Sequence, residues 1–124
     1  MRPNLQTVQP VLMSRDVSAS IDFFEKLGFT LEGQDVADDP KYARMCRENV
    51  ELHFQWHDAQ EWAYPNDRPS YRFVVQDVEE LQREFSESGV SDKTPVSKTP
   101  WGTLEFLVRD YDGNLLQFYR WLEP

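Results

Sequence analysis

The chain has 124 residues, of which 40% are apolar and 14% aromatic, so we expect one domain over 1–124 with a single hydrophobic core. Its 13 basic and 22 acidic residues give a net charge of -9, which disfavours binding to nucleic acid or to an anionic membrane. No apolar run approaches the ~18 residues of a membrane-spanning helix, and no secretory signal is recognisable at the start. The sequence therefore predicts a cytoplasmic protein.

The first half of the chain predicts a strand, a helix and three further strands. The apolar segment 7–15 is typical of a short strand, and its Pro10 restricts it to a sheet edge or a bulge. Asp16 stands at the N-cap position of a helix over 17–27, in which apolar residues recur with helical spacing until Gly28. Further strands are predicted at 29–33, 42–47 and 50–56.

Polar and apolar side chains alternate along 50–56, VELHFQW, which predicts one packed face and one polar face. If the apolar face lies on the helix, Glu51 and His53 line the space around which the sheet curves. These two residues are therefore the first candidates for ligand binding. A polar face in contact with solvent alone is the alternative.

The second half repeats the pattern of the first. Residues 57–69 contain two prolines and several turn-forming residues, which indicates a connection between halves. After it, Asp77 and Gly89 bracket a helix as Asp16 and Gly28 do earlier, at a constant offset. Extended segments are predicted at 71–75, from Val90 onward, and at 103–110 and 115–121, the last two joined by the turn 110–114.

Each half therefore predicts one βαβββ module, and neither module could bury its sheet alone. We expect an α+β fold with module one at about 7–57 and module two at about 69–122. The two modules would form curved mixed sheets around a shared cavity, with the helices outside. Inward-facing positions from both halves would then converge on one site.

Three segments carry a resemblance to a known superfamily: PVLMSRDVSASIDFFEKLGF, NVELHFQWH and PWGTLEFLVRDYDGNLLQF. Their motifs and spacing resemble the glyoxalase/bleomycin resistance protein/dioxygenase (vicinal oxygen chelate) superfamily. The first motif and the closing DYDGN turn are shared across that superfamily, so they bear on the fold more than on function. Pro100-Trp101-Gly102, followed by Glu105-Phe106, is similar to a segment of the bleomycin resistance proteins.

Metal-dependent members of this superfamily hold a metal through four inward-facing ligands. The resemblance places these positions at Gln9, Glu51, Tyr71 (or Ser70) and Gln117. Divalent transition metals prefer imidazole, carboxylate or thiolate, whereas amides are weak donors and a phenol is a rare one. We therefore predict no metal and no cofactor. Because His53 shares a face with Glu51, a glyoxalase-like metal-dependent lyase, isomerase or dioxygenase is the alternative.

Aromatic residues are frequent in the predicted cavity strands and loops, where they offer flat faces to planar or cationic ligands. Trp101 lies in a loop with little core to fill, and the resemblance implies that it stacks on the flat heterocycles of a drug. The predicted ligand-binding residues are Trp101, Glu51, His53, Trp56, Tyr71, Phe106, Gln117 and Tyr119. Further aromatic candidates are Trp62, Tyr64 and Trp121.

The resemblance to bleomycin resistance proteins implies a metal-free homodimer that sequesters a cationic or aromatic drug without modifying it. It also implies clefts between the subunits and exchange of the first strand, with Pro10 near the hinge. The net charge of -9 suits a cationic ligand such as bleomycin. No nucleophile and base pair is recognisable around Ser14, Cys46 or Ser70, so no catalytic residue is predicted.

Overall fold

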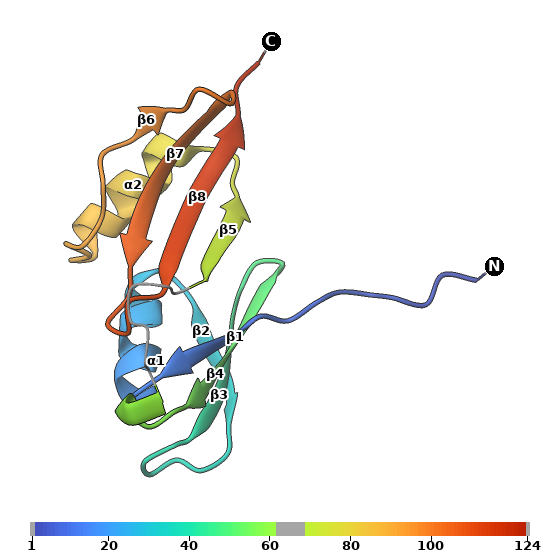
Figure 1. Cartoon of the computed structure of the whole chain (residues 1–124), viewed down its shortest axis with the longest axis vertical. Coiled ribbons are helices and arrows are strands. Elements are labelled where there is room, and N and C mark those ends of the chain that lie inside the picture. The colour runs from blue at the N-terminus through green and yellow to red at the C-terminus, as the bar shows by residue number, and fades with distance from the viewer. Residues whose placement is uncertain (1, 62–68, 124) are drawn as a thin grey trace.

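The computed structural model describes residues 2–61 and 69–123, so Trp62 and Tyr64 lie outside it. Two βαβββ modules follow one another along the long axis, which confirms the predicted α+β architecture (Figure 1). The first contains β1 (Val11–Ser14), α1 (Val17–Lys26), β2 (Thr30–Gln34), β3 (Tyr42–Arg47) and β4 (Val50–Trp56), and a short 3-10 turn, η1 (Ala59–Glu61), follows it. The second contains β5 (Ser70–Val74), α2 (Val78–Glu87), β6 (Ser97–Lys98), β7 (Thr103–Arg109) and β8 (Leu115–Trp121).

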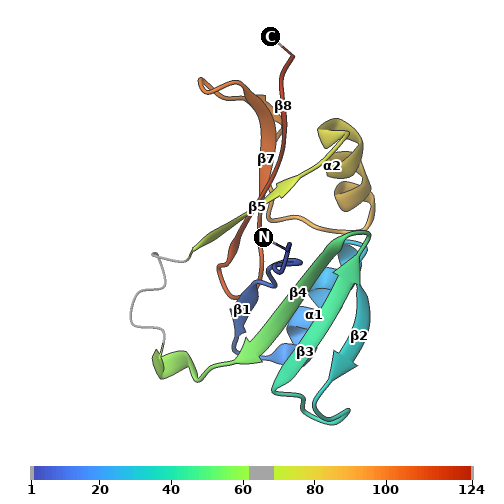
Figure 2. The same ribbon diagram turned by 90° about the vertical axis from the view of Figure 1, so that its right-hand side faces the viewer.

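The two sheets have the same topology, as expected for repeated modules. Their strand orders are β1-β4-β3-β2 and β5-β8-β7-β6, with one parallel pair at the β1 or β5 edge and antiparallel pairs elsewhere. In both views α1 covers one face of the first sheet and α2 one face of the second (Figures 1 and 2). The described strands do not close a barrel, so the opposite face of each sheet is left uncovered within one chain.

Side-chain caps and glycines fix both helices at the predicted places. The Asp16 carboxylate accepts a hydrogen bond from the Ala19 amide at 3.2 Å, and Asp77 accepts one from the Glu80 amide at 2.9 Å. Gly28 follows α1 with a φ of 86°, and a Cβ there would lie 2.6 Å from Nη1 of Arg47. No helix of the described residues is long and apolar enough to cross a membrane.

Two extended segments differ from the prediction. β1 begins at Val11 instead of residue 7, because only Val11–Ser14 lies in register with β4. Residues 2–8 run away from the body of the chain and expose apolar side chains, with Leu5 96% and Val8 83% exposed (Figure 1). The segment after Val90 forms only the short β6, preceded by one isolated bridge.

Phenylalanine side chains dominate the core between the helices and the sheets. Phe24 of α1 lies 4.7 Å from the Phe54 ring of β4, measured between ring centroids. In the second module Phe85 of α2 packs edge-on against Phe106 and Phe118 at 5.9 and 5.3 Å. These contacts bury the apolar stripe of each helix and stabilise its module by the removal of apolar surface from water.

The modules meet through the ends of their helices. Arg47 of β3 donates to both carboxylate oxygens of Glu84 in α2, at 2.7 and 3.0 Å, and to the Leu27 carbonyl at 2.8 Å. The Ser88 hydroxyl, just after α2, donates to the Lys26 carbonyl of α1 at 2.7 Å.

The turn between β7 and β8 contains a buried carboxylate. Asp110 accepts hydrogen bonds from the Asp112 amide at 2.9 Å, the Asn114 amide at 2.8 Å and the Asn114 side chain at 2.8 Å. Burial outweighs these donors and raises the pKa of Asp110 to about 6. The side chain therefore loses its proton in the folded state at a pH where the unfolded chain has already lost it.

This raised pKa predicts a pH-dependent stability. The folded chain binds more protons than the unfolded chain between the ordinary pKa of 3.8 and about 6, so stability falls as the pH rises through this window. Between the acidic and the neutral side of this window, the free energy of unfolding of the unmodified protein should fall by up to about 3 kcal/mol more than that of Asp110→Asn. Urea unfolding across this range measures it; parallel pH curves for the two proteins would contradict the assignment.

Candidate functional site

The polar face of the first sheet forms as the alternation in β4 predicts. Leu52 and Phe54 are buried on the α1 side, whereas Glu51 and His53 lie on the uncovered side. Their side chains are only 27% and 14% exposed because neighbouring side chains shield them.

A chain of hydrogen bonds runs across this face. His53 bridges two partners: its Nε2 lies 2.7 Å from Oε2 of Glu51, and its Nδ1 lies 2.5 Å from the Tyr42 hydroxyl of β3. A carboxylate only accepts, so Nε2 carries the proton, and Nδ1 of a neutral imidazole then accepts from the phenol. Gln9, from the extended N-terminal segment, donates to the same Glu51 oxygen at 2.9 Å. The face is thus an ordered network with Glu51 at its centre.

The charge of Glu51 is stabilised by its surroundings. The hydrogen bond with His53 lowers the pKa of Glu51 below its usual value, against an opposing effect of desolvation, and the Cys46 thiol and Arg44 lower it further. Desolvation, followed by the charge of Glu51, raises the pKa of Cys46. At neutral pH the face therefore presents a carboxylate and a protonated thiol, which suits a cationic ligand group and gives no reactive thiolate.

The polar face of the second sheet contains a second ordered set. Gln117 and Tyr119 lie on the β8 face opposite the core residue Phe118. Arg72 of β5 donates to Oε1 of Gln117 at 2.9 Å, and its guanidinium carbon lies 4.1 Å from the centre of the Tyr119 ring. Its Nη2 lies 3.5 Å from Oε2 of Glu105 in β7.

Three other predicted residues are not on these polar faces. Phe106 is 1% exposed and stacks on Phe118 at 5.2 Å between ring centroids, so it belongs to the core under α2. Tyr71 pairs with Leu116 and packs against the same core. Trp56, at the end of β4, lies on the α1 side, where its indole donates to the Arg15 carbonyl at 3.1 Å. The structure therefore corrects the placement of Phe106 as a cavity residue, and it leaves Trp101 60% exposed before β7.

Sequence reasoning missed Tyr42, Arg72 and Glu105. Tyr42 could have been found from the alternation in 42–47, which places it on the same face as Arg44 and Cys46. The pairing of Arg72 with Glu105 had no local signal, because it joins two strands that are separated in sequence by α2 and β6.

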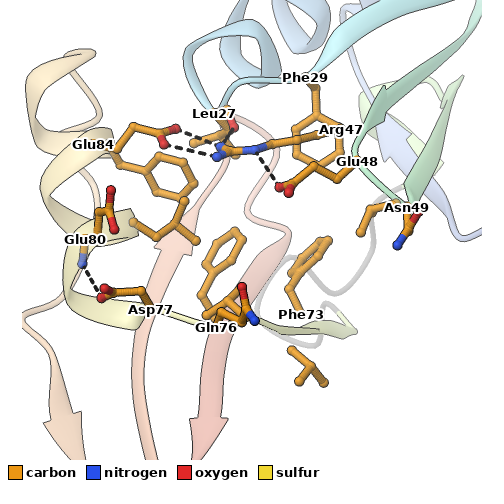
Figure 3. Close-up of a pocket in the computed structure, with 16 residues that line it drawn as sticks. Leu27, Phe29, Arg47, Glu48, Asn49, Phe73, Gln76, Asp77, Glu80 and Glu84 are labelled. Carbon is orange, nitrogen blue, oxygen red and sulfur yellow. Dashed lines mark hydrogen bonds and ion pairs between the residues drawn. The ribbon is translucent and has the colours of Figure 1, made fainter.

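A groove of about 600 Å³ lies where the modules face each other beside the N-terminal segment. It brings together Gln9 and Glu51 of the first module with Tyr71 and Arg72 of the second. A second hollow, of about 500 Å³, lies on the helix side, where Arg47 reaches across to Glu84 above the apolar side chains of Phe73 and its neighbours (Figure 3). Among the described residues that line these two hollows, predicted site residues occur only in the first, so it is the candidate functional site.

The donor set of this groove does not fit a transition-metal centre. Of the four superfamily positions, Gln9 and Glu51 touch each other, while Gln117 accepts from Arg72 on the other sheet. Within 2–61 and 69–123 no group of three or more His, Cys, Asp or Glu side chains could hold a metal ion. Glu51 is the one carboxylate among the four, and it is already bound by His53 and Gln9.

Comparisons with known proteins agree with this architecture. The sequence model of the Glyoxalase/Bleomycin resistance protein/Dioxygenase superfamily matches residues 6–118. No curated protein sequence matches the chain.

Solved structures are similar over almost the whole chain. The bleomycin-binding protein of Streptomyces verticillus, solved with copper(II)-bleomycin, has 30% identity and a TM-score of 0.75, and the match covers 94% of this chain and 97% of that one. A bleomycin resistance determinant encoded on transposon Tn5 has 22% identity and a TM-score of 0.80 over 94% and 98%. A glyoxalase-related enzyme from Clostridium phytofermentans has 16% identity and a TM-score of 0.75 over 97% and 98%, which shows the fold alone.

The repeated modules, the matched strand topology and the family match over residues 6–118 lead to one conclusion. The chain belongs to the glyoxalase/bleomycin resistance protein/dioxygenase superfamily.

Proposed function

We propose that the protein is a metal-free small-molecule-binding protein of the bleomycin resistance type, which sequesters a cationic or aromatic drug without modifying it. The observation that carries this proposal is the anionic Glu51, held by His53 and Gln9 at the wall of the 600 Å³ groove. An ordered carboxylate beside a groove attracts a cation, and the net charge of -9 adds long-range attraction. Antibiotic resistance in the cytoplasm is the corresponding biological role.

The proposal includes a homodimer. Both polar sheet faces are uncovered in one chain, and the exposed Leu5 and Val8 lie on an N-terminal segment that leaves the body of the chain (Figure 1). A second copy that covers these faces and the N-terminal segment would remove the side chains of Leu5 and Val8 from water and enclose the groove. Exchange of the N-terminal segment between the two copies is part of the same proposal.

Drug binding is tested by titration of the protein with metal-free bleomycin, followed by tryptophan fluorescence. We expect saturable quenching at about one drug per subunit, because the exposed indole of Trp101 gains an aromatic contact. Trp101→Ala should weaken binding by roughly tenfold, equivalent to about 1.4 kcal/mol, while Trp101→Phe retains most of the affinity.

Two results would count against this function. The absence of saturable quenching at drug concentrations on the order of tens of micromolar would remove the drug from the proposal. Near-stoichiometric metal in protein purified without a chelator would instead support the metal-dependent enzyme.

A further inference from the structure

A buried carboxylate on the uncovered face of the second sheet has incomplete hydrogen bonding. Glu105 of β7 is 7% exposed and is the cross-strand neighbour of Tyr119 in β8. Its side chain lies on the face opposite that of Phe106. Its Oε2 accepts from the Thr103 hydroxyl at 2.9 Å. Its other oxygen, Oε1, receives no hydrogen bond from the residues that the structure describes. A buried carboxylate normally has its oxygens satisfied, so this one is poised to receive a donor.

Arg72 covers Glu105 and donates one long hydrogen bond, to Oε2. The distance of 3.5 Å between Nη2 of Arg72 and Oε2 of Glu105 exceeds the usual ~2.7–2.9 Å of a charge-assisted hydrogen bond. The Arg72 side chain is 37% exposed, whereas that of Glu105 is 10% exposed. The guanidinium lies over the Tyr119 ring and donates to Gln117. The chain's own guanidinium thus shows that this place accepts a flat cation.

We propose that Glu105, Gln117 and Tyr119 form a subsite for a planar cationic group of a ligand, an amidinium or guanidinium, and that Arg72 fills this subsite when no ligand is bound. The ring of Tyr119 provides a face for the cation, and the two side-chain oxygens accept from its N–H edge.

The groove supports this arrangement. Arg72 lines the 600 Å³ groove and contacts Glu105, Gln117 and Tyr119, which do not line it. Displacement of Arg72 would extend the groove to these residues. The inference rests on the proposed function in that the groove is a ligand site, and it names the chemistry of one part of that ligand.

The test uses benzamidine, an aromatic amidinium, in calorimetric titrations of the full-length protein. An internal competitor reduces the apparent affinity, which is the intrinsic affinity multiplied by the fraction of time that the subsite is free. Arg72→Ala should therefore bind benzamidine at least about tenfold more tightly than the unmodified protein. The double variant Arg72→Ala, Glu105→Gln should lose this gain. Arg83→Ala is the matched control, because Arg83 is exposed on α2 and should leave the affinity unchanged.

Several results would overturn the proposal. Equal affinity in Arg72→Ala and the unmodified protein would do so, as would a gain that persists in the double variant. Binding of benzoate that is lost in Arg72→Ala would show that Arg72 itself anchors an anion. If Arg72→Ala unfolds because Glu105 is left uncovered, Arg72→Gln removes the charge and keeps a polar side chain, and the same gain is expected. Because benzamidine is not the drug, a failed bleomycin titration leaves this result interpretable.

Discussion

Phe106→Ala is expected to destabilise the protein by about 3–5 kcal/mol, as measured by urea unfolding. The ring is 1% exposed, stacks on Phe118 and meets Phe85 of α2 edge-on. Truncation would leave a cavity between the helix and the sheet that neighbouring side chains cannot fill. This loss is a large part of the stability of an ordinary single domain, which is about 5–15 kcal/mol.

The matched comparison is Trp101→Ala, five residues away in the same motif. Trp101 is 60% exposed, so its truncation should change the free energy of unfolding by no more than about 0.5 kcal/mol. A Phe106→Ala protein of nearly unchanged stability but with weakened drug binding would show that Phe106 contacts the ligand, as the sequence first suggested. We expect instead that Phe106→Ala lowers stability and that Trp101→Ala weakens drug binding.

Asp112→Ala is expected to lower the free energy of unfolding by about 3 kcal/mol, because the Asp112 side chain joins the two modules. Asp112 is 8% exposed and accepts from the Arg15 amide at 3.0 Å and from the Ser20 hydroxyl of α1 at 3.2 Å. The Arg15 side chain adds a contact at 3.3 Å. Hydrogen bonds to a charged group contribute about 1.5–3 kcal/mol each, and loss of the acceptor leaves the buried Ser20 hydroxyl with fewer partners.

Asp22→Ala provides the control for the loss of one carboxylate. Asp22 is exposed on α1, so its removal should change stability by less than about 0.5 kcal/mol. Thermal unfolding of both variants distinguishes a local effect from separation of the modules. Two separate transitions in Asp112→Ala would indicate that the modules then unfold independently, and a cost as small as that of Asp22→Ala would contradict the role of Asp112 as a junction.

In the proposed function, the two polar faces would divide the recognition of a ligand between the modules. The first face presents Glu51 within the network of His53 and Tyr42, and the second presents Glu105 beneath Arg72. Both carboxylates lie on the sides of the sheets that the helices leave uncovered. A cationic aromatic drug would thus meet a carboxylate on each sheet, without a metal ion between them.

Local sequence signals determined the elements and their repetition. Asp16 and Asp77 cap the two helices as predicted, and the alternation in 50–56 placed Glu51 and His53 on one face. These features depend on contacts within a few residues, so spacing and residue type are enough to predict them. The family segments added the expectation of two βαβββ modules, while the strand order within each sheet comes from the structure.

Only the tertiary structure decided which side chains meet. Two contacts depend on pairing between segments that are distant in sequence: that of Gln9 with Glu51, and that of Arg72 with Tyr119 and Glu105. Alternation along one strand predicts which side chains share a face, but the register between two strands decides which of them stand opposite each other. The start of β1 at Val11 has the same cause, because a strand exists only where a neighbouring strand pairs with it.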